Sequence, residues 1–236
     1  MPAGFRPQDW FRAFRRRRHF KKRYDVINYF VHSHAARSYL EIGVRSGTCF
    51  QRIRCEEKVG VDPNPVGDHS EWEIIPKTSD EFFAANDRKF DVVFIDGLHL
   101  AEQVTRDIFN ALTCLHARGV VLLHDCNPAT ERAQTRDESL AQKGEQWNGD
   151  VWKVVAFVRQ QCPELLCHVV AVDQGIGVIV PLEESQFEQP IEQYEMRARQ
   201  YFDTLSWDDL IENRAELLGL VAGRKALEQA LRRPRT

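Results

Sequence analysis

The sequence has no C-x-x-C pair among its six cysteines, and no apolar run in it approaches the roughly 20 residues of a membrane-spanning helix. Without paired cysteines we expect no zinc site, and thiols placed mostly in apolar segments indicate a reducing cytosol. The long apolar segment of a secretory signal is also missing. A length of 236 residues suits one large α/β domain with a terminal extension, so the sequence predicts a cytoplasmic globular protein.

The net charge is only −3, but the charge is unevenly distributed. Residues 1–24 carry nine basic side chains and one acid, so the remainder of the chain is acidic. The basic run 12–23 is interspersed with aromatic residues, a pattern typical of an amphipathic helix that contacts a membrane or a nucleic acid. A solvated leading helix or a disordered arm explains the same pattern, and we favour this second interpretation.

The stretch 39–50 joins an apolar strand run, a glycine-bearing turn and the start of a helix rich in small residues. Gly43 allows a sharp turn at the strand end, Gly47 allows the backbone to approach a ligand, and Ser46 can cap the helix. A second short strand then ends at Asp62, the acid expected to hold two ribose hydroxyls. This order predicts a crevice that binds a nucleoside.

Two side chains in this stretch indicate which nucleoside cofactor binds. Arg45 occupies the middle glycine position of the dinucleotide pattern G-x-G-x-x-G, and Glu41 stands two residues before Gly43. A carboxylate at this strand end repels a pyrophosphate, which a dinucleotide fold places there. S-adenosylmethionine carries an ammonium and a sulfonium but no phosphate, so the sequence predicts S-adenosylmethionine as the cofactor.

Hydrophobic periodicity and turn residues predict the remaining elements. We expect helices over 24–34, 46–55, 79–86, 101–116 and 151–161, strands over 38–42, 59–61, 73–75, 90–95, 119–123, 166–172 and 176–180, and helical sequence from 183 onward. The polar segment 128–146 is either a lid with a helical turn or disordered. The fold class is therefore α/β: a Rossmann-like, doubly wound, seven-stranded, mostly parallel sheet with an antiparallel edge strand and helical N- and C-terminal extensions.

Polar side chains follow the strands on both sides of the point where the strand order reverses. Because ligands of such sheets bind outside the carboxyl ends of the strands, we expect these side chains to converge on one crevice. The converging residues are Glu41, Gly43, Asp62, Asp96, His99, Asp125 and Asn127. Ser79 and Thr78 fall near the expected position of an adenine, although either of them can instead cap a helix.

Asp96 and Asp125 end two adjacent buried strands, where their carboxylates repel each other unless a cation lies between them. Oxygen ligands favour Mg²⁺ or Ca²⁺, and Asn127 or Asp150 can supply a further oxygen. We therefore predict a magnesium site made by Asp96, Asp125 and Asn127. The alternative is structural: Asp125 caps a helix or turn, and Asp96 bonds near Gly97.

His99 lies three residues after Asp96 and reaches the same crevice. An imidazole with an ordinary pKa near 6.5 suits a general base that takes a proton from a hydroxyl, so His99 is the predicted catalytic residue. A structural role is the alternative. We expect His124 behind the ligands or in the core. Trp147 and Trp152 can either wall a substrate or pack beneath a helix.

Four motifs together carry a family resemblance: Glu41-x-Gly-x-x-x-Gly47, Val61-Asp62, Phe94-Ile-Asp-Gly-x-His99 and Leu123-His-Asp125. Over residues 37–180 the chain resembles the class I methyltransferases, and within them the metal-dependent O-methyltransferases of catechols and antibiotic sugars. The resemblance implies a methyltransferase domain over 37–182, after an N-terminal arm and leading helix over 1–36 and before a helical extension over 183–236.

The resemblance also assigns roles to residues. It implies that Glu41, Gly43, Gly47 and Asp62 bind S-adenosylmethionine, that Asp96 and Asp125 bind Mg²⁺, and that His99 is the base. From their positions we also predict that Ser46, Ser79 and Asp96 contact the cofactor. The chain departs from the family at Cys126, where the group has an acid or an asparagine, because cysteine is a poor ligand for Mg²⁺. Either Asn127 or Asp150 substitutes for that ligand, or the metal site is weakened.

The leading functional hypothesis is metal-assisted methylation of a hydroxyl on a sugar or small polyol. A nucleoside-binding module without catalysis is a second hypothesis, which Cys126 favours. Metal-independent methylation of nitrogen or RNA is a third, in which the basic arm binds phosphates; the missing N-P-P-[YF] motif argues against base N-methylation. The C-terminal helices can also form a homodimer surface.

Overall fold

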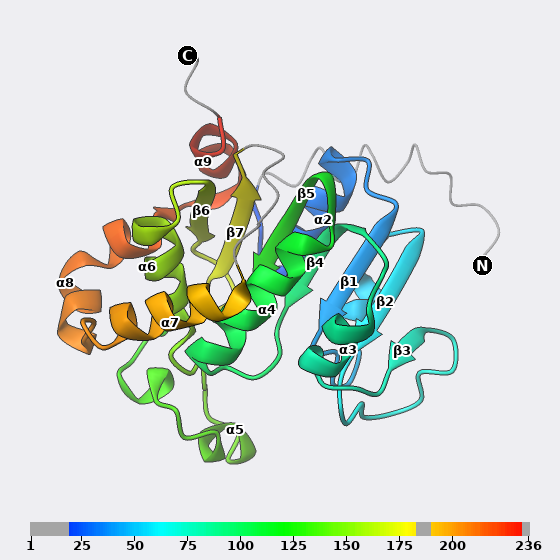
Figure 1. Ribbon diagram of the computed structural model, residues 1–236, viewed down its shortest axis with the longest axis horizontal. Helices are drawn as coiled ribbons and strands as arrows, with labels where there is room; N and C mark the ends of the chain where they lie inside the picture. Colours follow the sequence, from blue (N-terminus) through cyan, green and yellow to red (C-terminus); the bar gives the residue numbers. More distant parts are fainter. Residues whose placement is uncertain (1–18, 183–189, 233–236) are drawn as a thin grey trace.

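The computed structural model describes residues 19–182 and 190–232, and these build one twisted sheet with helices on both faces (Figure 1). The strand order is β3-β2-β1-β4-β5-β7-β6-β8. The strands are β1 Ser38–Ile42, β2 Glu57–Val61, β3 Glu73–Ile75, β4 Phe90–Ile95, β5 Leu115–Leu123, β6 Leu165–Val170, β7 Ile176–Pro181 and β8 Leu220–Val221. The predicted doubly wound α/β class is confirmed, with β7 antiparallel to both of its neighbours.

Helices cover the two faces in unequal number. The α-helices are α2 Arg23–Ser33, α3 Ser79–Ala85, α4 Ala101–Thr113, α5 Ser139–Gln142, α6 Val151–Gln161, α7 Ile191–Phe202, α8 Trp207–Leu218 and α9 Gly223–Ala230; the 3₁₀ turns are η1 Phe50–Arg52 and η2 Arg132–Gln134. One buried cluster joins the sheet to α3, α4, α6, α7 and α8, and a second joins its other face to α2 and α9.

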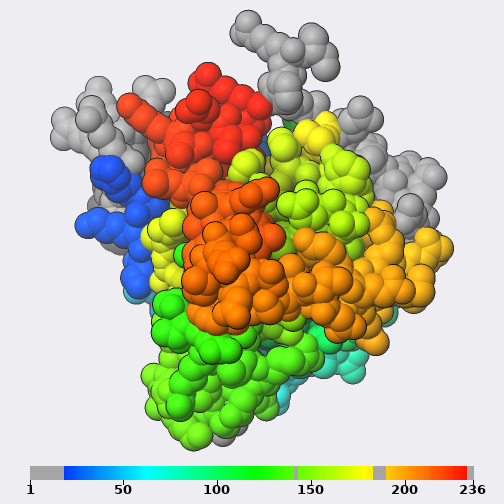
Figure 2. Space-filling model, turned by 90° about the vertical axis from the view of Figure 1, so that its left-hand side faces the viewer, coloured from blue at the N-terminus to red at the C-terminus, as the bar shows by residue number. Residues whose placement is uncertain are grey.

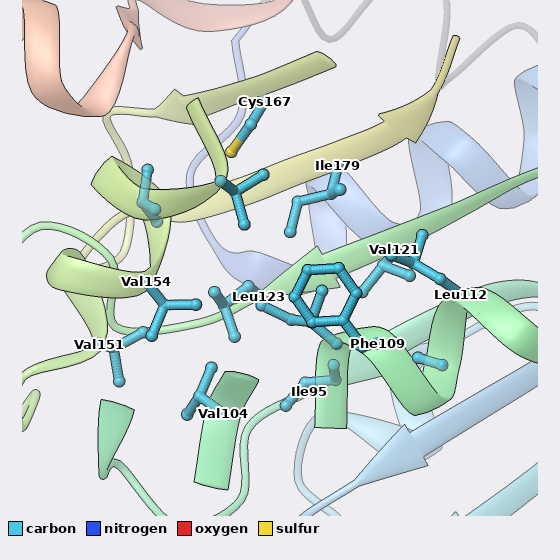
Figure 3. Close-up of a cluster of buried hydrophobic side chains, with 14 of the residues drawn as sticks. Ile95, Val104, Phe109, Leu112, Val121, Leu123, Val151, Val154, Cys167 and Ile179 are labelled. Atoms are coloured by element: carbon cyan, nitrogen blue, oxygen red, sulfur yellow. The ribbon is translucent and has the colours of Figure 1, made fainter. Parts of the chain in front are cut away.

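Residues 92–95 of β4 are all apolar because both faces of the strand are buried there. In β4, Val93 and Ile95 belong to the cluster beneath α4, whereas Val92 and Phe94 belong to the cluster beneath α2. Figure 3 shows the first of these clusters, where Phe109 of α4 lies among side chains from the strands and from α6. Alternate side chains of one strand thus fill two separate cores, which explains why the run lacks the polar alternation of a half-exposed strand.

The registers of β1, β4 and β5 bring three strand ends to one level. Ile42 pairs with Ile95, and Ile95 pairs with Leu123. The residues that follow these three positions therefore leave the sheet side by side. This register places Gly43, Asp96 and His124 at one edge, where the site described below is built.

The predicted helix over 46–55 is wrong, and a single 3₁₀ turn, η1, replaces it. Arg45 and Gly47 both adopt positive φ angles, of 46° and 69°, which interrupt helical geometry at its intended start. The buried Asn28 of α2 then holds the end of the turn. Its Nδ2 donates to the carbonyl of Arg52 (3.0 Å), and its Oδ1 accepts from the amide of Arg54 (2.9 Å). These bonds fix the connection as a turn against α2.

The C-terminal extension is part of the same globular body. Figure 2 shows α7, α8 and α9 forming one continuous surface above the segment 128–146. Tyr194 of α7 stacks on Phe109 of α4, with ring centroids 3.7 Å apart. The short strand β8 adds an eighth, unpredicted strand by pairing in parallel with β6. A homodimer through these helices stays a prediction.

Other sequence predictions concern the surface and the termini. All six cysteines are free, four of them buried, in agreement with the predicted reduced thiols. Within the described ranges, no helix is both long and apolar enough to cross a membrane. Most of the basic run 12–23 lies outside the described residues, and only its end, from His19, is seen. Its contact with lipid or nucleic acid remains a prediction.

Substitution of Tyr194 by alanine should lower the free energy of unfolding by roughly 3 kcal/mol, because it deletes a buried aromatic ring and leaves a cavity against α4. Tyr194 is 4% exposed. Met196, on the same helix, is 57% exposed, so Met196→Ala should change stability by less than about 0.5 kcal/mol. Denaturant unfolding of both variants checks this, and equal effects would contradict the packing of α7.

Candidate functional site

Three acids from separate parts of the chain meet at the carboxyl edge of the sheet. Asp96 directly follows β4, Asp125 is the second residue after β5, and Asp173 lies in the turn between β6 and β7. His124 contacts all three, through its ring nitrogens and the main chain of Asp173. In the part of the chain that the structure describes, one group has the geometry to hold a metal ion: Asp96, His124 and Asp125.

Asp96 is bonded to cationic partners through both carboxylate oxygens. Its Oδ2 accepts from Nη1 of Arg23 (2.5 Å), and its Oδ1 lies 3.1 Å from Nδ1 of His124 and 3.6 Å from Nε2 of His99. Burial alone would raise the pKa of this carboxyl. The charges and hydrogen bonds of His124, His99 and Arg23 outweigh burial and hold the pKa well below its usual range, so Asp96 is ionised.

His124 is the most enclosed member of the group, with a side chain 2% exposed. Its Nδ1 lies 2.6 Å from Oδ2 of Asp125, and its Nε2 lies 2.8 Å from the carbonyl oxygen of Asp173. Burial lowers the pKa of the imidazole, but Asp96 and Asp125 more than offset this effect and raise the pKa to about 10. The sequence predicted His124 in the core or behind the ligands, whereas the structure puts it between the two acids.

Asp125 is held in an unusual backbone conformation, with φ of 58°. Its Oδ1 accepts from Nδ2 of Asn148 (2.8 Å), and its Oδ2 lies 3.2 Å from Nε2 of His99. Asn148 is completely buried. Sequence reasoning missed Asn148, which is 23 residues from Asp125 along the chain and lies in a segment predicted only as the beginning of a helix.

His99 is fixed from both sides of its ring. Its Nδ1 lies 3.1 Å from the carbonyl oxygen of Trp147, and the indole of Trp147 stacks on the imidazole with centroids 4.8 Å apart. Because a carbonyl only accepts, Nδ1 carries a proton and Nε2 is the nitrogen that can exchange one. Burial lowers the pKa of His99, but the hydrogen bond with Asp96 and the charge of Asp125 outweigh it and raise the pKa above its ordinary value.

The close approach behind His99 depends on a glycine. Gly149 has φ of 57°, and a Cβ built on it would lie 1.7 Å from the carbonyl oxygen of His99. The segment 128–146, which precedes it, is folded and contains η2 and α5. The indole nitrogens of Trp147 and Trp152 donate to Thr135 and Gln134 of this segment. The segment is therefore folded and contains the helical turn that one alternative expected, whereas its role as a lid stays a prediction.

The predicted cofactor turn begins as expected. Gly43 has φ of 88°, and a Cβ there would lie 2.1 Å from the carbonyl oxygen of Asp96, so only glycine fits. Asp62 follows β2, and its carboxylate accepts from the amides of Arg45 (2.7 Å) and Asn64 (2.8 Å). The acid thereby ties the strand-end turn of β1 to that of β2, with its side chain at the same edge as Asp96.

Gly47 and Ser46 differ from their predicted surroundings. A Cβ on Gly47 would lie 2.6 Å from the ring of Trp72, so the glycine here makes room for an indole from the connection between β2 and β3. The hydroxyl of Ser46 bonds to that of Thr48 (2.9 Å), and no α-helix follows for Ser46 to cap. Their contacts with a cofactor stay predictions.

Glu41 lies inside the protein rather than on its surface. It is 1% exposed, and its Oε2 accepts from the hydroxyl of Tyr39 (2.5 Å). Burial raises the pKa of Glu41 to about 8, against the opposing effect of the bond from Tyr39. The carboxyl is therefore largely protonated at neutral pH, and its contact with the ammonium of a cofactor stays a prediction.

Thr78 and Ser79 were each expected either to cap a helix or to lie near an adenine, and their contacts in the structure differ. Thr78 caps α3, accepting from the amide of Glu81 while Glu81 reaches back to its amide. The structural interpretation is thus correct for Thr78. The hydroxyl of Ser79 accepts from Nε2 of Gln103 (3.1 Å), which also donates to the buried Asp107. A contact of Ser79 with adenine stays a prediction.

The other predicted metal ligands have protein partners elsewhere. Oδ1 of Asn127 accepts from Arg214 of α8 (2.7 Å). Asp150 accepts from the amide of Ala101 (2.8 Å), at the start of α4, and from Arg136 (2.7 Å). Cys126 is completely buried, and burial holds the pKa of its thiol well above the ordinary value. The structure therefore brings none of these three side chains to the group formed by Asp96 and Asp125.

Comparisons with known proteins agree with this architecture. Residues 40–126 match the family model described as a methyltransferase domain. A Staphylococcus aureus structure, named as a candidate caffeoyl-CoA O-methyltransferase, is similar at 17% identity over 75% of this chain and 93% of that chain, with a TM-score of 0.51. The SAH-bound methyltransferase PaMTH1 of Podospora anserina is similar at 16% identity over 77% and 90%, also with a TM-score of 0.51.

No curated protein sequence matches this chain. At such low identities the two structures show a shared fold alone, and the family model matches residues 40–126, less than half of the chain. The matched range begins in β1, before the Gly43 turn, and ends at Cys126, so it contains the acids after β2, β4 and β5.

Substitution of Glu41 by glutamine should flatten the pH dependence of stability. The pKa of Glu41 is about 8 in the folded protein, above the ordinary 4.5, so its contribution is complete below pH 4.5 and is lost as the pH rises through 8. Between pH 5 and pH 9 the variant should gain on the order of 4 kcal/mol relative to the wild type. Denaturant unfolding at both pH values measures this gain, and parallel profiles would show that the carboxyl is not enclosed.

Proposed function

We propose that this chain is a class I S-adenosylmethionine-dependent methyltransferase that transfers the methyl group to a hydroxyl of a small-molecule acceptor. The observation that carries the proposal is the position of His99. Its ring is fixed by Trp147, and its Nε2 lies against Asp125 and Asp96 at the strand edge where the Gly43 turn begins. A positioned proton acceptor is what an alcohol requires to become a nucleophile, since a neutral hydroxyl attacks poorly.

In this proposal the cofactor lies across the ends of β1, β2 and β4. Asp62 holds the ribose hydroxyls, the backbone of the Gly43 turn lies against the methionine part, and Asp96 contributes negative charge near the ammonium. Asp62 supports this placement because its carboxylate is partly exposed at the strand end while two amides fix its orientation. Such fixed orientation lowers the cost of binding.

The methyl transfer is an in-line displacement. The acceptor oxygen forms a bond to the methyl carbon as the bond from carbon to sulfur breaks, and that electron pair stays on sulfur to give neutral S-adenosylhomocysteine. The hydroxyl proton passes to Nε2 of His99 in the neutral form of the ring, after Nε2 has released to solvent the proton that it can donate to Asp125. The resulting imidazolium is stabilised by Asp125 and Asp96, as in other buried pairs of histidine and carboxylate. Positioning of the two reactants supplies much of the remaining rate enhancement.

Two finer predictions are not carried into this mechanism. The magnesium site of Asp96, Asp125 and Asn127 does not fit the contacts, because Asn127 is bonded to Arg214 and the acids are bonded to protein donors. We therefore route no step through a metal. The comparisons give no support for a sugar or polyol as the acceptor, so the proposal stops at a hydroxylated small molecule.

Asp62→Ala should weaken the binding of S-adenosylhomocysteine by about 1–3 kcal/mol, the loss of hydrogen bonds to two hydroxyls. Isothermal titration calorimetry measures the effect. Asn64, whose amide bonds to Asp62, offers a control: Asn64→Ala keeps that amide and should leave the affinity within about twofold. Unchanged affinity in Asp62→Ala, or tighter binding of NAD than of S-adenosylhomocysteine by the wild type, would argue against the cofactor assignment.

His99→Gln should bind S-adenosylhomocysteine as the wild type does, yet lose roughly 10²- to 10⁴-fold in turnover, the usual contribution of a positioned general base. Formation of S-adenosylhomocysteine from S-adenosylmethionine, assayed with a panel of hydroxylated acceptors, gives the readout. The exposed His116 is the second residue of β5, at the end of the strand away from Asp125, and provides the control His116→Gln. Full turnover in His99→Gln would exclude His99 as the general base. Binding of the cofactor by the wild type without turnover of any acceptor would favour a non-catalytic binding module.

A further inference from the structure

Arg23, the first residue of α2, bridges two carboxylates from distant parts of the chain. Its Nη1 donates to Oδ2 of Asp96, and its Nε and main-chain amide donate to Oδ2 of Asp173, at 3.1 and 3.0 Å. Lys22 adds a bond from Nζ to Oδ1 of Asp173 (3.2 Å). Asp173 thus caps the N-terminus of α2 from the β6–β7 turn, and the cap fixes the guanidinium over Asp96.

His124 brings a second cation to the same carboxylates. Its Nε2 faces a carbonyl oxygen, and its Nδ1 faces oxygens of Asp96 and Asp125; all of these atoms are acceptors. Each ring nitrogen thus faces only acceptors, and in this arrangement both nitrogens can donate a hydrogen bond. A metal ion bound at Nδ1 would have to displace the proton that joins the two acids.

The other oxygens of Asp125 and Asp96 have protein donors as well. Asn148 donates to Oδ1 of Asp125, and Nε2 of His99 lies within 3.2 Å of Oδ2. Nη1 of Arg23 donates to Oδ2 of Asp96. Each of the four carboxylate oxygens therefore lies within hydrogen-bond distance of at least one protein nitrogen.

The charges in this cluster nearly cancel. Asp96, Asp125 and Asp173 contribute three negative charges, and Arg23 and His124 contribute two positive charges, with Lys22 at the rim. Addition of a divalent cation would make the enclosed group positive unless a proton or the guanidinium left. In a partly buried site such an excess charge is costly.

We propose that Arg23 and His124 replace the divalent metal of the group that the sequence resembles, so that the acid pair is held by the chain's own cations. This proposal rests on the proposed function, because the proposed function is what places the two acids beside the methyl transfer. Arg23 and His124 are positioning residues here: they fix Asp96 and Asp125 against His99. An acceptor then needs one hydroxyl for His99 and gains nothing from a second oxygen able to chelate a metal.

The decisive experiment uses the full-length wild-type protein after treatment with EDTA. Binding of S-adenosylhomocysteine should be the same within about twofold in EDTA and in millimolar Mg²⁺. Titration with Mn²⁺ followed by electron paramagnetic resonance, and with Zn²⁺ by calorimetry, should give no saturable site in the micromolar range. A micromolar site that is lost in His124→Gln or Asp96→Asn would overturn the proposal. Failure to bind S-adenosylhomocysteine under either condition would instead refute the proposed function.

Arg23 variants test the replacement directly. Arg23→Met removes the cation but keeps the aliphatic stem, so it should lower the melting temperature and create a site whose occupation by Mn²⁺ restores part of the loss. Arg23→Lys should keep the metal-free behaviour, and Lys21→Met, an exposed neighbour, should match the wild type. If Mn²⁺ raises the melting temperature of Lys21→Met or of the wild type as much as that of Arg23→Met, the proposal is overturned. If Arg23→Met does not fold, the wild-type titration decides.

Discussion

Mutual repulsion of the carboxylates at the sheet edge is the constraint on which the site depends. A doubly wound sheet delivers Asp96 and Asp125 to one place by register, because β4 and β5 are adjacent parallel strands that end at the same level. Two buried carboxylates at the ends of adjacent strands are tolerated only beside positive charge. The protein meets the requirement with Arg23 at the start of α2 and His124 directly after β5.

This solution ties the site to the whole fold. Arg23 reaches Asp96 only because α2 lies across the sheet face, and α2 lies there because Val26, Ile27 and Phe30 fill the core on that side. Asp173 holds the same arginine from the β6–β7 turn. The geometry of His99 depends likewise on the segment before α6, through Trp147 and the close backbone approach at Gly149.

Sequence reasoning predicted the elements that depend on local pattern. The bounds of β1, β3 and β4 are those expected, because each is a short apolar run enclosed by turn residues. The helix over 46–55 failed because its pattern fits a helix locally, whereas the positive φ angles at Arg45 and Gly47 and the bonds from Asn28 of another element decide the outcome.

The same distinction applies to the site. Asp96, His99 and Asp125 were found as candidates because the ends of neighbouring strands must meet, and the structure brings these three together. Arg23 and Asn148 were missed because their bonds span 73 and 23 residues and follow no local motif. Asn127 was assigned by its position after β5, but the side chain turns to Arg214, which only the packing of α8 determines.

The two-residue strand β8 has a consequence for the integrity of the sheet. It pairs with Val169 and Val170 of β6, which otherwise forms the border of the sheet on that side. An uncovered border strand presents a row of open amides and carbonyls that can recruit a strand from another molecule. The strand β8 covers Val169 and Val170 at this border, and we expect its removal to leave these positions of β6 open to pairing with another chain.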